Sequence, residues 1–444
     1  MRLPTLVSLI THLSFASSCL LEIERNGGHV VDRSEPLRRR QAPDNSVPVG
    51  SGDRFNNGAI VPRGLGVSPP TEPSDIYNLV EIKSAVKALC QEFNLPYFEA
   101  PYRTYENRTV FGFRVGGKPN KPQNKGYQVM LESAIHARER GGPDHLLNFV
   151  SDLLFAKRAN VGLTYGGVAY TAQDVRTVLD LGLVIIPVVN PDGVAYDQST
   201  NLCWRKNRNP TSAIPGNPNS VGVDLNRNFS PVWNFTKAMV PGVQAASEDP
   251  ANEQFHGTGP LSEPETKNVD WVMSQHSELG WFIDQHSVAG VVIHGWCHDS
   301  NQVSNPAMNF LNPAYDGKRG ALPDTLSTMY REYIKQRDWD DMSITAARIA
   351  GAMTDSTARA YVAMPAANFY PSSGCSADQG NFRAAMASGP ASRMTIRGFG
   401  LEFGMPKDPA GGCPFYPTAQ EHKLNMVENG AGFMAFLLNA ARLS

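Results

Sequence analysis

Apolar residues of the chain fall into helical and strand-like segments from about residue 74 onward. In the first segment they are three or four positions apart, which predicts an amphipathic helix: Leu79, Ile82, Val86, Leu89 and Phe93. Ser74 is of a residue type that caps helix N-termini, so we expect it to begin this helix. Pro143 suits a first helical position and predicts a second helix, with four apolar residues inward: Leu146, Leu147, Val150 and Leu154.

Short apolar runs alternate with these helices and predict strands. The run at 181–189 is almost wholly apolar, which is typical of a strand covered on both faces. Further strands are expected at 127–135, 281–286, 290–294 and 394–403, and further helices at 324–358, in one or two pieces, and 419–441. This alternation predicts an α/β fold, a single domain with a mixed, largely parallel twisted sheet flanked by helices.

The N-terminal part of the chain has the composition of targeting and processing segments. Residues 1–18 combine one basic residue, an apolar stretch and a small-residue end, so we expect a signal peptide and a secreted, extracellular protein. Residues 19–40 end in three arginines, which indicates a short propeptide cut at this tribasic site; the alternative is a solvated charge cluster. The Pro-, Gly- and Ser-rich residues 41–73 predict a linker, and the folded domain is expected at 74–444.

Composition and charge exclude some classes of function. A chain of 444 residues, 41% of them hydrophobic, can bury a large core. Its formal net charge of -2 gives no electrostatic basis for binding nucleic acid or an anionic membrane surface. No segment after the signal peptide has the ~18 uninterrupted apolar residues of a membrane span, so no membrane anchor is expected.

One short stretch carries candidate metal ligands. In SAIHARERGG, His136 and Glu139 are three residues apart just after a predicted strand, and ligands of such sheets collect at the carboxyl ends of strands. A catalytic zinc site takes three protein ligands, often two histidines and one glutamate. The third ligand is expected at the end of another strand, and His286 closes an apolar strand in this way.

A rival histidine cluster lies a few residues further on. His294 and His298 flank Cys297, but no partner carboxylate is expected for this cluster. In a secreted chain, Cys297 is expected to be bridged or buried rather than to ligate a metal as a thiolate. We therefore assign the third metal ligand to His286.

A series of motifs in one order resembles the zinc metallocarboxypeptidases of the pancreatic carboxypeptidase A/B type, and the resemblance covers residues 77–441. These motifs are HARE (136–139), NPDG (190–193), WRKNR (204–208), GVDLNRNF (222–229), HGTGPLSEPET (256–266), FIDQHS (282–287), FYPSSG (369–374) and GLEFG (400–404). The resemblance implies a zinc carboxypeptidase-like fold at 74–444 and one Zn²⁺ per chain, bound by His136, Glu139 and His286.

The same resemblance implies the roles of the other site residues. Glu402 is expected to be the general base and Arg205 to polarise the scissile carbonyl. Asn226 and Arg227 are expected to bind the terminal carboxylate of the substrate, because a guanidinium forks onto a carboxylate with two hydrogen bonds. Tyr370 would close over that carboxylate, and Arg138 would contact residues upstream of the cut.

The implied activity is that of a metallocarboxypeptidase, a secreted monomer acting on peptides and proteins with a free C-terminal carboxylate. By the resemblance, Ala377 lies at the base of the pocket for the C-terminal side chain, so aromatic or large aliphatic residues are expected there, with the adjacent Asp378 structural. Two alternatives stay open: a catalytically inactive binding protein on this fold, and an amidase or deacylase acting on non-peptide or cell-wall substrates.

Cysteines and glycosylation sequons complete the expectations. The resemblance implies the disulfides Cys297–Cys375 at the specificity pocket and Cys203–Cys413 near the upstream subsites, with Cys90 left as a free thiol. Of the sequons at Asn107, Asn228 and Asn234, the second follows a predicted substrate-binding arginine directly, so glycans are expected at the other two. Arg140 stands where animal relatives commonly carry tryptophan, a change without an explanation in the sequence.

Overall fold

The structure is a computed structural model that describes residues 45–67, 70, 72–118, 126–323, 325, 329–386, 395–407 and 412–444. The expected signal peptide, the propeptide and its tribasic site lie outside the described residues. No helix within the described ranges is both long enough and apolar enough to cross a membrane.

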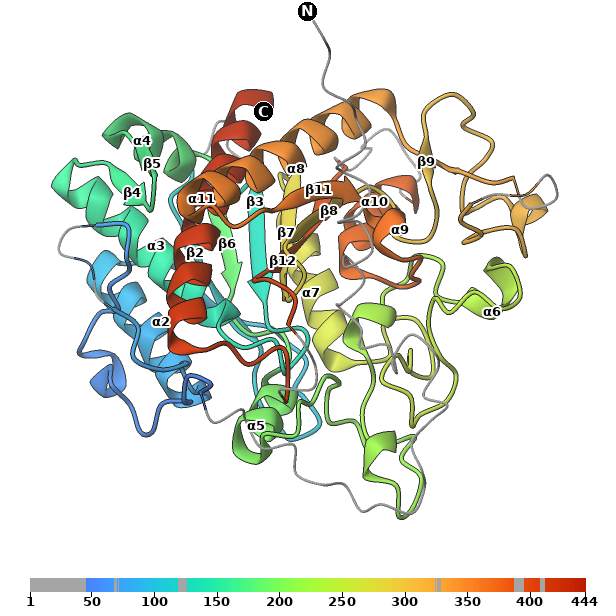
Figure 1. The fold of residues 1–444 in the computed structure, drawn as a ribbon, viewed down its shortest axis with the longest axis horizontal. Coiled ribbons are helices and arrows are strands. Elements are labelled where there is room, and N and C mark those ends of the chain that lie inside the picture. The colour runs from blue at the N-terminus through green and yellow to red at the C-terminus, as the bar shows by residue number, and fades with distance from the viewer. Residues whose placement is uncertain are drawn as a thin grey trace, which may run out of the picture.

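Among the described residues, eight strands form one mixed sheet, which crosses the middle of the molecule (Figure 1). The neighbouring pairs β6–β3, β3–β7, β7–β12 and β8–β11 are parallel, and the other three pairs are antiparallel. In order across the sheet the strands are β1 (Tyr97–Glu99), β2 (Phe111–Val115), β6 (Leu183–Ile186), β3 (Val129–Ser133), β7 (Trp281–Ser287), β12 (Arg397–Phe403), β8 (Val291–His294) and β11 (Val362–Pro365). Two further pairs lie outside this sheet: β4 (Leu163–Tyr165) with β5 (Val168–Tyr170), and β9 (Asn301–Gln302) with β10 (Glu332–Tyr333).

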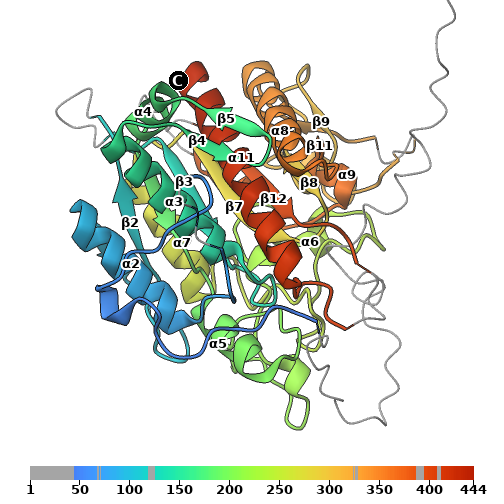
Figure 2. The ribbon, with the colours of Figure 1, turned by 60° about the vertical axis from the view of Figure 1, so that its left-hand side comes forward.

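Helices cover both faces of the sheet (Figures 1 and 2). They are α2 (Leu79–Phe93), α3 (Gly142–Ala159), α4 (Ala172–Asp180), α5 (Pro191–Thr200), α6 (Phe235–Ala238), α7 (Pro264–Gln275), α8 (Gln336–Thr357), α9 (Ala366–Phe369), α10 (Ser376–Met386) and α11 (Ala419–Leu443). Alternate residues of β3 belong to two hydrophobic cores, one on each face of the sheet. Leu131 packs with α2, α3, α8 and α11, whereas its neighbour Met130 packs with α7 on the other face. The expected α/β fold is confirmed.

Helix α10 lies directly on the sheet because one strand position has no side chain. A Cβ atom at Gly398 would stand 2.1 Å from the backbone oxygen of Ala377 in α10. The absence of that atom permits the close approach, which sets the first turn of α10 against the amino-terminal part of β12.

Several sequence-based boundaries differ from the structure. Helix α2 begins at Leu79 and is capped by Asn78, not Ser74, because Asn78 and Glu81 each accept a hydrogen bond from the backbone N–H of the other. Helix α8 begins only at Gln336, so residues 329–335, expected to be helical, contribute strand β10 instead. All five predicted strands exist; β7 is one residue longer than expected, and the other four are shorter.

The segment expected to be a linker is packed against the domain over residues 45–67. Phe55 is 4% exposed, belongs to the main core and contacts Tyr77 edge to face with ring centroids 5.1 Å apart. Arg54 donates from Nε to Glu81 at 2.8 Å, so an ion pair reinforces the packing. A few apolar residues are enough to pack this Pro- and Gly-rich segment against the domain. The folded part of the chain therefore begins well before Ser74.

Candidate active site

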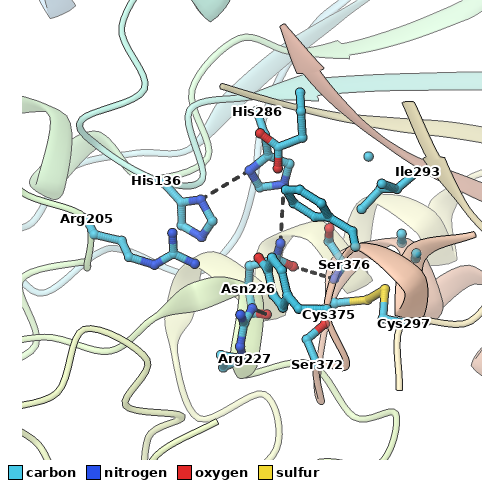
Figure 3. A pocket seen from close by; sticks show the side chains of 16 residues that line it. His136, Arg205, Asn226, Arg227, His286, Ile293, Cys297, Ser372, Cys375 and Ser376 are labelled. Atoms are coloured by element: carbon cyan, nitrogen blue, oxygen red, sulfur yellow. Dashed lines mark hydrogen bonds between the residues drawn. A yellow bond between two sulfur atoms is a disulfide. The ribbon is translucent and has the colours of Figure 1, made fainter. Parts of the chain in front are cut away.

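Three side chains from two sequence regions, His136, Glu139 and His286, meet at the carboxyl ends of β3 and β7. Figure 3 shows the two histidines of this group. His136 Nδ1 is 2.8 Å from Glu139 Oε1, His286 Nδ1 is 3.0 Å from Glu139 Oε2, and the two Nδ1 atoms are 3.1 Å apart. All three residues are buried, and their donor atoms converge within 4.8 Å. Two imidazoles and one carboxylate are the donor set of a catalytic zinc site, so these residues fit Zn²⁺.

The outer nitrogens of both histidines contact buried aspartates. His136 Nε2 is 3.1 Å from Asp224 Oδ1, and His286 Nε2 is 2.9 Å from Asp284 Oδ2. A proton on each Nε2 satisfies these contacts and leaves the Nδ1 lone pairs for a metal. Burial would raise the pKa of Glu139, but the two histidines hold it below its ordinary value, so this carboxylate is ionised.

Neither aspartate was singled out from the sequence. Asp284 lies two residues before His286, so strand periodicity puts both side chains on one face of β7, and this spacing could have identified it. Asp224 lies two residues before Asn226 inside GVDLNRNF, and its role depends on contacts with segments far along the chain.

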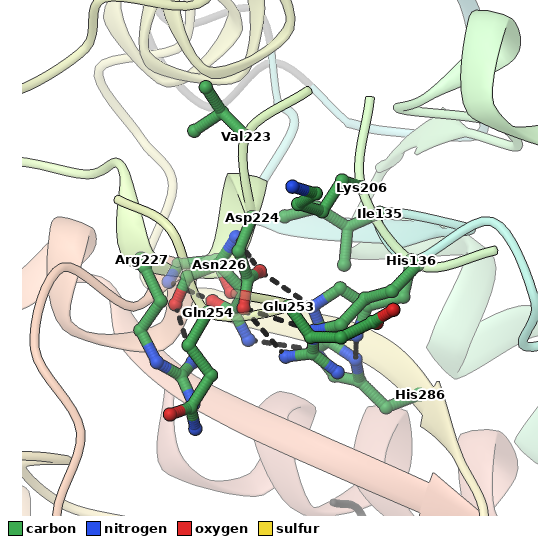
Figure 4. A network of polar contacts seen from close by, with 12 residues as sticks. Ile135, His136, Lys206, Val223, Asp224, Asn226, Arg227, Glu253, Gln254 and His286 are labelled. Carbon is green, nitrogen blue, oxygen red and sulfur yellow. Dashed lines mark hydrogen bonds and ion pairs between the residues drawn. The ribbon is translucent and has the colours of Figure 1, made fainter. Parts of the chain in front are cut away.

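Asp224 is the centre of the polar network around the site (Figure 4). Its Oδ2 atom accepts from Arg205 Nε at 3.0 Å, and its Oδ1 atom accepts from the backbone N–H of Asn226 at 3.0 Å. Burial would raise the pKa of Asp224, but Arg205, Arg227 and His136 outweigh burial and hold it well below its ordinary value. One ionised carboxylate therefore positions a metal ligand, a cationic side chain and the Asn226–Arg227 turn together.

Glu402 completes the cluster from the next strand. It lies opposite His286 in the parallel β12–β7 register, is 4% exposed and lines the same pocket as His136 and His286. The neighbours Gly400 and Gly404 leave its side chain uncrowded on that face of the strand. The predicted general base is thus beside the predicted metal ligands.

Asn226, Arg227 and Tyr370 line the same pocket as His136, His286 and Glu402. Arg227 is 1% exposed and its Nη1 donates to the backbone oxygen of Asn226 at 2.8 Å. Among the described residues, its buried Nε and Nη2 atoms have no hydrogen-bond partner. The Arg227 guanidinium lies 5.6 Å from the centre of the Tyr370 ring.

The opposite wall of the pocket is apolar. It contains Ile293, Ala366, Ala377 and the Cys297–Cys375 disulfide (Figure 3). Asp378, the next residue after Ala377, is not part of the lining and accepts hydrogen bonds from the backbone N–H of Cys297 at 3.1 and 3.2 Å. The structure thus places Ala377 in the wall and Asp378 behind it, as expected.

Arg138 lies outside this pocket. Its Nη1 donates to Glu253 at 3.0 Å, and its guanidinium stacks 4.4 Å from the centre of the Phe415 ring. Both expected disulfides, Cys203–Cys413 and Cys297–Cys375, are present and Cys90 is free, which confirms the predicted pairing.

Arg140, unexplained in the sequence, has a structural role. It donates from Nε to Asp197 at 2.8 Å and stacks 3.6 Å from the centre of the Tyr416 ring, while Tyr416 donates its hydroxyl to the same aspartate at 2.6 Å. An arginine here ties α5 to the segment before α11.

Within the described residues, His294, Cys297 and His298 do not converge as a set of metal ligands. His294 contacts Trp339, and burial lowers its pKa to about 4. His298 is 2.7 Å from Glu332 and 3.5 Å from Asp378, so the expectation that no carboxylate lies near it is wrong. The fold brings these acids from 34 and 80 residues along the chain, which the sequence does not reveal.

Comparisons with known proteins agree with this geometry. The sequence matches the zinc carboxypeptidase family, Peptidase_M14, over residues 102–421, so the chain belongs to that family. It is 26% identical to human carboxypeptidase O over 325 residues, which are 70% of this chain and 75% of that protein. It is 25% identical to the inactive metallocarboxypeptidase ecm14 of Talaromyces stipitatus over 207 residues, covering 45% of this chain and 31% of that one.

A structural comparison supports the same fold. Thrombin activatable fibrinolysis inhibitor superposes with a TM-score of 0.60 at 20% identity, covering 88% of this chain and 79% of that chain. Several other curated relatives match over little more than half of their own length. Family and fold are therefore established, whereas substrate and activity require argument from the site.

Proposed function

We propose that this protein is a secreted, monomeric zinc-dependent exopeptidase that hydrolyses the C-terminal peptide bond of peptides and proteins. Aromatic or large aliphatic C-terminal residues are its preferred substrates. The observation that carries the proposal is the buried guanidinium of Arg227, whose Nε and Nη2 atoms lack hydrogen-bond partners among the described residues. Leaving such donors unsatisfied is costly, and a carboxylate in the pocket would satisfy two of them at once.

The proposed carboxylate site and the proposed reacting centre lie in different parts of one pocket. Arg227 and Asn226 are on one turn, and His136, His286 and Glu402 line the other part of the same pocket. A terminal carboxylate held by Arg227 would bring the adjacent peptide bond toward the three-ligand cluster, which is the arrangement an exopeptidase requires. Tyr370, close to Arg227, would cover the carboxylate from the solvent side.

His136, Glu139 and His286 would hold Zn²⁺, which supplies Lewis acidity that polarises a carbonyl oxygen and lowers the pKa of water. Glu402 would accept the proton of the attacking water and return it to the leaving amine. Arg205, fixed by Asp224, would stabilise negative charge that develops on the carbonyl oxygen. The apolar wall with Ala377 would receive the C-terminal side chain.

An inactive binding protein is the main alternative, because one relative is named inactive. Retention of His136, Glu139, His286 and Glu402 supports the active enzyme over that alternative. An amidase that ignores terminal carboxylates would not need the Arg227 site.

The test uses paired peptides that differ only in a free or amidated C-terminus, incubated with the purified protein with and without a zinc chelator. We expect release of the last residue from the free acid alone, and loss of that release with the chelator. Equal cleavage of the amide would support the amidase, and binding of the free acid without cleavage would support the binding protein.

A further inference from the structure

A buried, charged cluster lies behind the apolar wall of the pocket and is not used by the proposed chemistry. It consists of Asp378, His298 and Glu332, which are at most 1% exposed. His298 stands between the two acids, with Nε2 2.7 Å from Glu332 and Nδ1 3.5 Å from Asp378. Asp378 is in α10, His298 is in the segment after β8, and Glu332 is in β10.

The orientation of α10 decides which of its residues reaches the pocket. Ser376 donates its backbone N–H to Asn226 Oδ1 at 2.8 Å and its hydroxyl to Asp284, so the first turn is anchored to two residues of the site. Consecutive helical residues point about 100° apart. With Ser376 fixed, Ala377 lines the pocket and Asp378 is turned behind the wall.

Asp378 needs a counter-charge to stay there, because a buried unpaired carboxylate is costly. Burial would lower the pKa of His298, but Asp378 and Glu332 raise it to about 9, so His298 is a cation at neutral pH. Burial nevertheless leaves the pKa of Asp378 above its ordinary value. The cationic imidazole is therefore a counter-charge shared by Asp378 and Glu332.

Glu332 is itself firmly held, which fixes His298 in turn. It accepts from the backbone N–H of Phe310 at 3.0 Å and from the hydroxyl of Tyr330. Arg319 stacks 4.9 Å from the centre of the Tyr330 ring and pairs with Asp316 at 3.0 Å. Tyr330 and Phe310 therefore fix Glu332, and Glu332 fixes the His298 ring between the two acids.

We propose that His298 is a positioning residue for substrate specificity: it holds Asp378 behind the wall, so that the pocket selects apolar C-terminal side chains and disfavours Lys and Arg. This inference rests on the proposed function. Without His298, the Asp378 carboxylate would lose its counter-charge, would face Glu332 of like charge, and would gain solvation by turning toward the pocket.

The test measures kcat/KM for otherwise identical peptides ending in Arg and in Phe, and the Arg/Phe ratio is the readout. The variants are His298→Gln, which keeps a donor without the charge, and His298→Leu, which keeps neither. Asp378→Asn is combined with His298→Gln, and His276→Leu is the control, at a buried histidine that does not line the pocket. Ala377→Asp is the positive control, since it puts a carboxylate in the wall.

We expect His298→Gln to raise the Arg/Phe ratio by about tenfold or more, and the Asp378→Asn, His298→Gln double variant to return it to within about twofold of wild type. His276→Leu should leave the ratio unchanged. A ratio that stays at the wild-type value in folded His298→Gln, or that rises equally in the double variant, would overturn the inference. If His298→Leu fails to fold, His298→Gln decides alone.

The wild-type measurement tests the proposed function separately. A wild-type protein that releases no C-terminal residue, or that releases Arg faster than Phe, contradicts the proposed activity or preference before any variant is considered. A wild-type protein with the expected preference and an unaltered His298→Gln contradicts only the role of His298.

Discussion

Glu402 and His286 are register partners on the adjacent parallel strands β12 and β7. Both side chains point into the same pocket, and both are 4% exposed. The distance between the predicted base and the metal ligand is therefore set by sheet hydrogen bonds rather than by a loop. Strand pairing gives a more rigid placement than loop residues could, which suits a proton transfer at short range.

Removal of the charge behind His286 should weaken metal binding. Asp284→Asn keeps the size of the side chain but loses the ionised contact with His286 Nε2. We expect zinc affinity to fall by about tenfold or more, measured by competition with a chromophoric chelator. Ser376→Ala, which removes only the hydroxyl that contacts Asp284, should change affinity less. An unchanged affinity in folded Asp284→Asn would exclude this role.

The parts of the fold that could be predicted are those with a strong local signal. β3 and β7 are buried on both faces and have strongly apolar starts, so their strand ends, and hence the positions of His136 and His286, were predictable. Strands of two or three residues, such as β4 and β10, carry too few positions to show a period.

Other features depend on tertiary contacts that no local pattern records. The helix cap is an exception, because Glu81 three residues after Asn78 completes a capping box, a local pattern that favours Asn78 over Ser74. Phe55 is a single apolar residue in a segment whose average composition indicates a linker. The partners of His298 come from distant elements, so its environment was misjudged.

Replacement of Arg227, the proposed carboxylate-binding residue, should remove selectivity for free C-termini. Arg227→Lys keeps a positive charge but loses the planar fork, so we expect kcat/KM on a free-acid peptide to fall about 100-fold. Zinc content should not change, because Arg227 is not a metal ligand. Paired free-acid and amidated peptides measure the effect, and wild-type selectivity in this variant would argue against a carboxylate at Arg227.

The His298 cluster should make the free energy of unfolding fall as the pH rises into the alkaline range. Its folded pKa, about 9, is above the ordinary value of 6.5, so its stabilising contribution is complete below pH 6.5 and is lost as pH rises through about 9. The loss should approach about 3 kcal/mol in the free energy of unfolding. Denaturant unfolding between pH 6 and pH 10 should show a flatter profile for His298→Gln; parallel profiles would contradict the assignment.

Glycan attachment should follow the exposure of the three sequons. Asn228 is fully buried, and its amide donates to the backbone oxygen of His256 at 2.9 Å and to Ser262 at 2.9 Å. Asn107 and Asn234 are exposed. Mass spectrometry of protein secreted from a eukaryotic host should find glycans at Asn107 and Asn234 alone, and an occupied Asn228 would contradict its placement beside Arg227.

The central claim, that this chain is an active zinc carboxypeptidase with Glu402 as its base, is tested most directly by Glu402→Gln. The measurement pairs zinc content by mass spectrometry with the rate of C-terminal residue release from a free-acid peptide. We predict one zinc per chain in both proteins and a rate reduced by about 10²–10⁴-fold in the variant, the usual contribution of a general base. A Glu402→Gln protein that binds zinc and hydrolyses the peptide at the wild-type rate would contradict the account.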